Sequence, residues 1–421
     1  MELMSGSGGD RVDPPRMPSP LLRTRRSEAG RESFQVEIET TTPILGGAPV
    51  IRSLDTIDVI RVPTIRGHLR FWWRALYGHQ YCTEAELFRK EAALWGKAAD
   101  GKGGGGRSPV EISVDVPGHV RKSCRTDDDD PPPNSREGYV LWAARATAEE
   151  KKAGRKGAPR YRPSIGFRMT VSAPTGQLAA VRHATRAWIL FGGYGSRTRR
   201  GLGALTVVGQ KQSEWLPDDD DEAESAEHLG KSLQELFGWS VFAASGSAKI
   251  AQLPGASFLV GDLHRDRGRH HESASNAWKA AIGWLMDFRR DLSPASGARG
   301  HGSSPLVTAT RLGQRAEIGL PITDSNSPPA FQIVWRQDGK HRDRLASPVI
   351  VKPLPTLLGF RPCALWLARP APLGDLTVTG IDPEPRVLRA MNDGGMARSD
   401  FVTRLTTAPR GERSAATKIS P

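Results

Sequence analysis

Cysteine is scarce in this chain of 421 residues. The three present, Cys82, Cys124 and Cys363, stand far apart and form no C-x-x-C pair. This spacing argues against a structural zinc site and a disulfide framework, and it is typical of proteins from a reducing cytoplasm. Long apolar runs are also missing, since no stretch approaches the roughly 18 apolar residues that a membrane-spanning helix needs. We therefore expect a cytoplasmic protein without membrane contact.

Negative charge is in deficit. The chain has 59 Lys and Arg against 46 Asp and Glu, a formal net charge of +13. Such an excess favours a polyanionic partner, and arginine suits phosphate because its guanidinium group is a planar fork of donors. A GC-rich genome, which enriches Arg, Gly, Pro and Ala throughout, is the alternative explanation of this composition.

Signatures of nucleotide hydrolysis are missing as well. No G-x-x-x-x-G-K-[ST] sequence occurs, and the glycine- and arginine-rich loop at residues 192–203 follows an expected helix instead of linking a strand to a helix. Neither a Walker loop nor a dinucleotide fingerprint is therefore indicated.

Candidates for nuclease chemistry are few. His68 lies among basic residues and could transfer a proton at a 2′-hydroxyl, although a histidine near phosphates is more often a hydrogen-bond donor. Segment 262–272 holds Asp, His and Glu side chains that could bind a metal, but its arginines would repel a cation. The acidic runs 127–130 and 218–221 are interpreted as solvated surface. We therefore predict no catalytic residue, no metal and no cofactor.

Hydrophobic periodicity predicts an α+β fold. Strands are expected over residues 34–40, 110–116, 167–171, 331–335, 349–351 and 364–368, and helices over residues 65–77, 83–95, 175–191 and 273–290. The predicted organisation is a disordered or loosely docked arm (1–32), a first module (33–210), an acidic linker or loop (211–235), a second module (236–407) and a flexible tail (408–421). This order differs from a repeated βαβα pattern.

The helix expected at residues 65–77, with Thr64 as its cap, has two contrasting faces. Its apolar face contains Ile65, Leu69, Trp72, Trp73 and Leu76. Its basic stripe contains Arg66, Arg70 and Arg74, spaced four residues apart. Such stripes are usually solvated, but this one begins in the first turn, where free backbone N–H groups also favour anions.

The loop at residues 192–203 is the most informative local segment. Five glycines allow sharp turns and close approach of another chain, and the loop also supplies three arginines, Ser196 and Thr198 as donors. The segment is therefore interpreted as a phosphate-binding loop. A helix-to-strand turn with solvated arginines is the alternative.

Several of these segments resemble the RAMP proteins, the repeat-associated proteins of CRISPR systems. The similar segments are residues 42–47 (TPILGG), 60–74 (IRVPTIRGHLRFWWR) and 94–96 (LWG), with residues 193–203 similar to the RAMP glycine loop and residues 317–321 and 344–353 also alike. Within the superfamily, the chain looks like the first subunits of Cmr (type III-B CRISPR) effector complexes. The resemblance spans about residues 34–368 and leaves the N-terminal arm and the loops near Gly101, Asp127 and Asp262 unassigned.

The resemblance implies two packed ferredoxin-like (RRM-like) modules with long loop insertions. It also implies a non-catalytic RNA-binding subunit at the end of the complex where the 3′ region of the guide RNA lies. The implied partners are guide RNA (crRNA), target RNA, the sixth Cmr subunit and the backbone RAMP subunits.

The arginine-rich segments and the resemblance to RAMP proteins together predict a surface that neutralises RNA phosphates. Its predicted members are Arg66, Gly67, His68, Arg70, Arg74, Arg162, Arg168, Tyr194, Gly195, Ser196, Arg197, Thr198, Arg199, Arg200 and Gly201. If exposed, Tyr194 or Trp72 would add base stacking of about 1–3 kcal/mol per base. Two alternatives stay open: a metal-independent RAMP endoribonuclease that processes guide precursors through His68, and an adaptor that contacts mainly protein.

Overall fold

The fold is described from a computed structural model. It describes residues 30–48, 50, 52–55, 57–99, 105–220, 225–243, 248–268, 270–291, 317–319, 322–324, 331–337, 340–342, 345–370, 375–379, 386–389, 396–407 and 416–419. Most of the expected N-terminal arm and much of the expected tail lie outside these residues. In the described part of the chain, no helix combines the length and apolar character that a membrane crossing requires.

The first module has a four-stranded antiparallel sheet. Its strands are β1 (Arg31–Thr40), β3 (Glu111–Asp115), β6 (Gly166–Pro174) and β7 (Leu205–Val207), in the order β3-β6-β1-β7. Helix α1 (Val62–Tyr77) lies between β1 and β3 in the sequence, and α6 (Thr175–Phe191) lies between β6 and β7. This is the split β-α-β arrangement of the ferredoxin-like fold. The expected alternation is confirmed, since Phe34, Val36 and Ile38 are buried on the helix side.

The second module repeats this topology. Its strands are β8 (Gln252–Val260), β13 (Val349–Pro355), β14 (Gly359–Ala368) and β17 (Thr417–Lys418), in the order β13-β14-β8-β17. Helix α8 (His270–Asp291) lies between β8 and β13 in the sequence, and α10 (Met396–Thr407) lies between β14 and β17. The short β9 (His264–Arg265) pairs with β14. The predicted α+β fold of two ferredoxin-like modules is thus confirmed.

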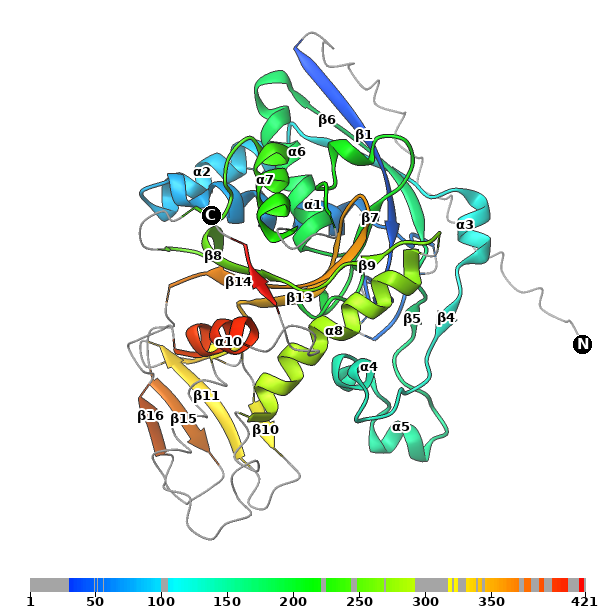
Figure 1. Ribbon diagram of the computed structural model, residues 1–421, viewed down its shortest axis with the longest axis vertical. Coiled ribbons are helices and arrows are strands. Elements are labelled where there is room, and N and C mark those ends of the chain that lie inside the picture. The colour runs from blue at the N-terminus through cyan, green and yellow to red at the C-terminus, as the bar shows by residue number, and fades with distance from the viewer. Residues whose placement is uncertain are drawn as a thin grey trace, which may run out of the picture.

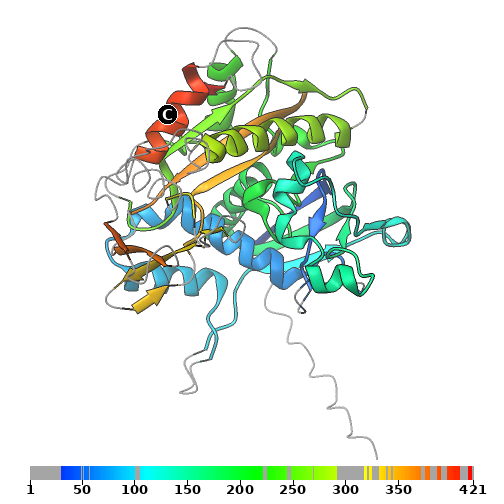
Figure 2. The same cartoon turned by 90° about the horizontal axis from the view of Figure 1, so that it is seen from below.

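The two modules stack into four layers. One apolar cluster runs from β1 and β6 through α1 and α6 into β8 and β14, so these two helices lie between two sheets. The ring of Phe191, for example, is 5.4 Å from that of Phe258. Helices α8 and α10 cover the other face of the second sheet through Trp284, Phe288 and Phe401 (Figures 1 and 2). The second sheet is therefore buried on both faces, whereas the first has one open face.

Insertions between these elements build smaller units. Strands β10 (Ile322–Asp324), β11 (Phe331–Gln337), β12 (Lys340–Arg342), β15 (Asp375–Thr379) and β16 (Arg386–Arg389) form a separate sheet. Strands β2 (Ile44–Leu45), β4 (Thr126–Asp127) and β5 (Arg160–Tyr161) form another, next to α3 (Gly118–Ser123), α4 (Arg136–Val140) and α5 (Ala148–Lys152). Helix α2 (Glu84–Trp95) begins at Thr83, whose side chain accepts a hydrogen bond from the Glu86 N–H.

The acidic run 127–130 is not simply solvated, contrary to the sequence interpretation. Arg160 pairs with Asp127 at 2.7 Å, and Lys156 pairs with Asp129 at 2.9 Å. The acidic run and the basic segment 151–162 therefore neutralise one another, which neither shows by itself in the sequence.

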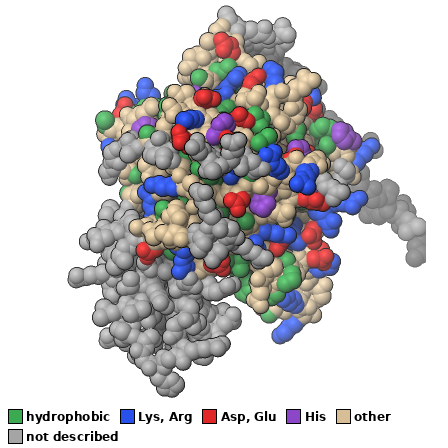
Figure 3. Space-filling view, viewed as in Figure 1, with side chains coloured by type: hydrophobic (Ala, Val, Ile, Leu, Met, Phe, Trp, Pro, Cys, Tyr) green, Lys and Arg blue, Asp and Glu red, His purple; other side chains and the backbone are tan. Residues whose placement is uncertain are grey.

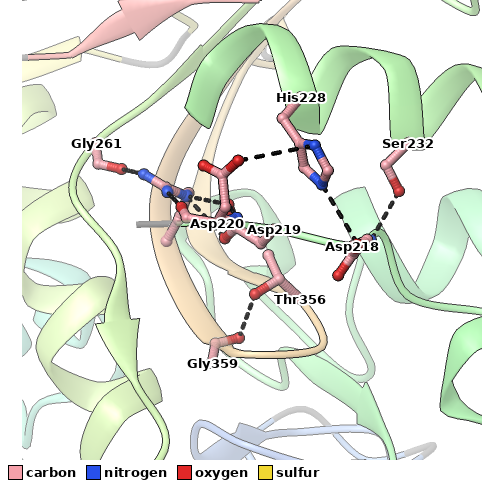
Figure 4. Close-up of polar contacts among 9 residues, drawn as sticks. Asp218, Asp219, Asp220, His228, Ser232, Gly261, Thr356 and Gly359 are labelled. Atoms are coloured by element: carbon pink, nitrogen blue, oxygen red, sulfur yellow. Dashed lines mark hydrogen bonds and ion pairs between the residues drawn. The ribbon is translucent and has the colours of Figure 1, made fainter. Parts of the chain in front are cut away.

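The acidic run 218–221 was also interpreted as solvated surface, and the structure contradicts this at Asp219. The side chain of Asp219 is fully buried and accepts hydrogen bonds from Arg361 Nε at 2.8 and 3.1 Å (Figure 4). The remaining Arg361 nitrogens donate to the carbonyls of Gly261 and Asp220. On α7 (Ser225–Phe237), His228 lies between the carboxylates of Asp218 and Asp220. The segment after the first module is therefore fixed onto the second sheet.

We expect Asp219→Asn to destabilise the protein by about 3–5 kcal/mol, because it leaves the buried Arg361 guanidinium without a counter-charge. Urea unfolding followed by circular dichroism measures this change. Asp218→Asn is the matched control, because the Asp218 side chain is largely exposed. Equal stability of the two variants would contradict the assignment.

A second buried charge also joins the modules. Lys352 of β13 is buried, and its Nζ donates at 2.7 Å to the carbonyl of Ile189 in the last turn of α6. A cationic or donor group is favourable there, because the final carbonyls of a helix lack intrahelical partners. Burial lowers the pKa of Lys352 to about 7.

This lowered pKa predicts a pH-dependent stability. Above pH 7 the folded chain releases the Lys352 proton, while the unfolded chain keeps it up to its ordinary pKa near 10.4, so stability increases with pH in this interval. Relative to Lys352→Met, the wild type should gain up to about 1.4 kcal/mol of unfolding free energy per pH unit between pH 8 and 10. Denaturant titrations at each pH test this, with exposed Lys211→Met as control. Parallel profiles for the wild type and Lys352→Met would refute it.

Candidate nucleic-acid interface

The loop between α6 and β7 is a hydrogen-bonded turn. The backbone N–H of Ser196 donates to Leu45 O at 2.7 Å, and that of Tyr194 donates to Gly203 O at 2.8 Å. Gly195 has a φ of +91°, and a Cβ there would lie 2.8 Å from Leu45 O. Glycine is therefore required at this position, and the loop is held against the strand β2.

The loop arginines connect the two modules. Residues 198–200 form a single 3-10 turn, and the guanidinium groups around it donate to carbonyl oxygens: Arg197 to Val140 O (2.9 Å), Arg199 to Ser347 O (2.6 Å) and Arg200 to Val349 O (3.1 Å). In return, Trp278 Nε1 of α8 donates to Arg200 O at 2.8 Å. The predicted phosphate-binding loop is thus also the junction of the modules.

These three arginines have no carboxylate partner among the ion pairs of the described residues. Burial lowers the pKa of Arg199, and burial with neighbouring cations lowers the pKa of Arg200 to about 10. Both remain charged at neutral pH. Arg197 stays exposed, and Arg199 and Arg200 are half-buried. Among the described residues, the junction therefore concentrates positive charge without carboxylate partners.

A small cavity of about 180 Å³ lies between this loop and α1. His68 and Phe71 line it from α1, and Gly193, Thr198 and Arg199 line it from the loop. Arg199 Cζ is 5.8 Å from the centre of the Phe71 ring. The cavity thus combines an aromatic surface, a cation and polar groups.

His68 is the titratable group of this cavity. Its ring stacks on Trp188 at 6.1 Å, and its buried Nε2 has no hydrogen-bond partner among the described residues. Burial lowers its pKa to about 4, so the imidazole is neutral at pH 7. A neutral ring with an unpartnered nitrogen suits hydrogen bonding to a ligand.

The predicted arginine stripe does not join the loop. Arg66 donates to Val110 O at 3.1 Å, while Arg70 pairs with Glu91 of α2 and Arg74 lies 3.7 Å from the same carboxylate. At 100° per residue, Arg66 and Arg70 lie on the flank of α1 opposite to His68. The single surface that we predicted is therefore two regions, and Arg70 and Arg74 are largely occupied by Glu91.

Both predicted stacking residues are buried. Tyr194 is 1% exposed and Trp72 is 2% exposed. The Tyr194 hydroxyl accepts a hydrogen bond from the Arg61 N–H at 2.8 Å. Neither ring is exposed, so the condition on which base stacking was expected is not met. The predicted Thr64 cap was wrong, because α1 begins at Val62 with Arg61 at its N-cap.

The remaining predicted residues are dispersed or structural. Arg168 pairs with Glu37 at 2.9 Å on the open face of the first sheet, and Arg162 is exposed after β5. Gly201 has a φ of +73° and contacts Trp278, so its role is to close the junction. On the face seen in Figure 3, cations are interspersed with carboxylates and form no single basic patch.

The open face of the first sheet lacks the stacking groups of an RNA-recognition motif. The outward positions of β1, β3, β6 and β7 hold Ser33, Gln35, Glu37, Glu39, Glu111, Ser113, Asp115, Arg168, Thr170, Ser172 and Thr206. None is aromatic, whereas RNA-recognition motifs stack bases on aromatics of this face. RNA contact is therefore expected elsewhere on the chain.

Segment 262–272 contains residues that could bind a metal. The described part of segment 262–272 contains no group of three ligands within reach of one ion. Asp127, Asp128 and Asp129 do lie close together, but Lys156 and Arg160 already pair with them.

Comparisons with known proteins agree with this fold. Residues 37–206 match the RAMP superfamily model. The CRISPR system Cmr subunit Cmr1-1 of Pyrococcus furiosus is 27% identical over 193 residues, which cover 44% of this chain and about half (50%) of that protein. The predicted resemblance is thus confirmed.

Solved structures were matched as well. The crystal structure of Cmr1 from Pyrococcus furiosus in its apo form gives a TM-score of 0.50 at 17% identity, covering 92% of this chain and 98% of that one. A chain of a type III-B Cmr-beta structure bound to cognate target RNA gives 0.44 at 11% identity, covering 87% and 99%. The first of these supports the fold.

The substitution Gly67→Ala tests whether RNA approaches the backbone of α1. A Cβ there would meet no atom within 4 Å, so Gly67→Ala should stabilise the helix by about 0.5–1 kcal/mol. If RNA approaches the α1 backbone, the same variant should bind RNA several-fold more weakly despite a higher Tm. Gly176→Ala in α6, equally open, is the control. Unchanged affinity would remove Gly67 from the interface.

Proposed function

We propose that this chain is a non-catalytic RNA-binding subunit of a type III-B CRISPR effector complex. The observation that carries the proposal is the group of loop arginines, Arg197, Arg199 and Arg200, which has no carboxylate partner among the described residues and lies beside the His68 cavity. The similarity to a Cmr subunit supports the same assignment.

The partners in this proposal follow from the family. The chain would engage the 3′ region of the guide RNA and the guide–target duplex at one end of the complex. It would lie beside the sixth Cmr subunit and the backbone RAMP subunits. The acidic open face of the first sheet would point away from the RNA, because its carboxylates repel phosphates.

Binding at the junction would combine charge with local hydrogen bonding. Exposed Arg197 offers free donors to a phosphate, and the half-buried Arg199 adds a guanidinium beside Phe71. Neutral His68 can exchange a hydrogen bond with a ribose hydroxyl or a base edge. Neutralising phosphates gives sequence-independent affinity that falls steeply with salt.

The environment of His68 argues against acid–base catalysis. General acids and bases work best with a pKa near the operating pH, whereas burial holds the pKa of His68 at about 4. The second candidate is still a metal-independent endoribonuclease, and the specific observation in its favour is the unpartnered His68 Nε2 at a cavity that also contains Arg199.

The test is electrophoretic retention of labelled single-stranded RNA by the purified chain, over a range of salt, in EDTA, with cleavage products monitored. We expect intact RNA and retention that decreases steeply with salt. Arg197→Ala should weaken binding and lower the log–log salt slope by about 0.7 per lost phosphate contact. The control is Lys211→Ala, which removes an exposed cation that pairs with Glu214.

Two outcomes would reject this function. Shortened RNA that becomes intact in His68→Ala would identify a ribonuclease. Salt-insensitive assembly with partner subunits, without any RNA crosslink to the chain, would identify a protein adaptor. Because Arg199 and Arg200 join the modules, their alanine variants need a parallel unfolding measurement.

A further inference from the structure

An exposed tryptophan lies close to the loop junction. Trp142 begins the 3-10 turn Trp142–Ala144, which follows α4, and its side chain is 59% exposed. Leu141 and Ala144, on either side of it, are buried in the cluster that also contains Leu202 of the loop and Trp278 of α8. The largest side chain of this turn is therefore left in solvent while smaller ones pack inward, although burial of the largest would remove the most apolar surface from water.

Hydrogen bonds fix the turn that carries Trp142. The guanidinium group of Arg52 donates to Ala143 O at 3.0 Å and to Arg145 O at 3.2 Å, so it bridges two carbonyls that directly follow Trp142. Because this backbone is already ordered, a ligand that contacts the Trp142 ring has little conformational freedom left to remove.

Two cations lie beside this ring. Arg145 Cζ is 5.6 Å from the centre of the Trp142 ring, and Arg145 Nη1 donates to Pro131 O at 3.1 Å. The exposed Arg197 donates to Val140 O at 2.9 Å, and Val140 is only two residues, a span of at most about 7 Å, from Trp142. Neither arginine has a carboxylate partner among the ion pairs of the described residues.

Two carboxylates of the same unit already have cationic partners. Helix α4 lies beside α8 (Figure 1), and its Glu137 pairs with Lys279 of α8 at 2.9 Å. Glu150 pairs with Arg52 at 3.0 Å. With these pairs formed, the two arginines beside the Trp142 ring are available to a phosphate.

We propose that Trp142 stacks on an unpaired base of the RNA whose phosphates meet the loop arginines. The inference rests on the proposed function and adds a base contact to it. An exposed indole with a guanidinium group over one face suits any base, because every base has a π-face. Single-stranded RNA is favoured over a duplex, because only an unpaired base can leave its own stack for an aromatic side chain.

A protein partner is the competing occupant of this surface. Val50 and Ile57 are also exposed, in the loop that Arg52 joins to the turn. RNA is favoured because the ring is continuous with the loop arginines, and because the cations beside it have no carboxylate partners among the described residues. A strand that places a phosphate at Arg197 can therefore reach Trp142 with an adjacent base.

The experiment measures retention of oligo(U) RNA, and of an abasic oligoribonucleotide of equal length, by the purified full chain over a range of salt. Trp142→Ala should weaken binding of oligo(U) by about 5- to 150-fold, the equivalent of one lost stacked base. Its log–log salt slope and its affinity for the abasic strand should equal those of the wild type, because no phosphate contact is lost. Trp142→Phe should recover most of the lost affinity.

The matched control is Phe88→Ala, which removes an aromatic side chain that is also exposed, from α2. Its affinity for both strands should equal that of the wild type. Since the Trp142 side chain is exposed, Trp142→Ala should also keep the wild-type circular dichroism spectrum and urea midpoint.

The outcomes separate this inference from the proposed function. If the wild-type chain shows no salt-dependent retention, the proposed RNA-binding function fails. If the wild type binds but Trp142→Ala keeps its affinity, or loses as much affinity for the abasic strand, the stacking inference alone is overturned. A Trp142→Ala variant that binds RNA normally but no longer binds a partner subunit would show a protein contact and also overturn it.

Discussion

The enclosure of α1 and α6 between two sheets is the constraint on which the rest of the structure depends. Trp188 and Phe191 of α6 are fully buried in the cluster that joins both modules. Because both broad faces of this helical layer are covered, only its flanks and ends can meet a ligand. The loop junction and the His68 cavity lie at the end of α6, so the candidate contact occurs where this layer reaches the surface.

The sequence predicted the elements with a clear period, and only part of those without one: strands β13 and β14, buried at every position, were predicted with shorter bounds. Strands β1 and β6 alternate because one face is open, and α6 has the expected bounds of Thr175 and Phe191. Strand β8 is nearly all buried and contains Pro and Gly, so neither alternation nor composition reveals it. The role of Asp219 was equally hidden, because its partner Arg361 lies 142 residues further along the chain.

The arrangement of the predicted site residues differs from the single surface that we expected. The glycines and arginines of residues 192–203 identified the loop. The sequence did not show that the buried Tyr194 hydroxyl accepts a hydrogen bond from the distant Arg61 N–H, or that Arg70 forms an ion pair with Glu91.

Arginine content overstates the charge that this protein can offer to a polyanion. Arg361 is buried against Asp219, Arg398 donates to Ser257 and Gly255, and Arg186 donates to the carbonyls of Glu214 and Leu236. These side chains act as long-range connectors of the fold. Among the described residues, Arg197, Arg199 and Arg200 donate to carbonyl oxygens without a carboxylate partner, and their position is more informative than the net charge.

The late position of β17 has a consequence for biosynthesis. The first sheet is complete once β7 ends at Val207, but β17 at Thr417–Lys418 is needed to complete the second. At about 5–20 residues per second, the ribosome needs tens of seconds for the intervening segment. Until β14 has been made, at Ala368, the apolar side of α1 and α6 that will face the second sheet has an incomplete cover. The nascent chain therefore exposes a broad apolar surface, which makes it a natural client for chaperones that bind such surfaces.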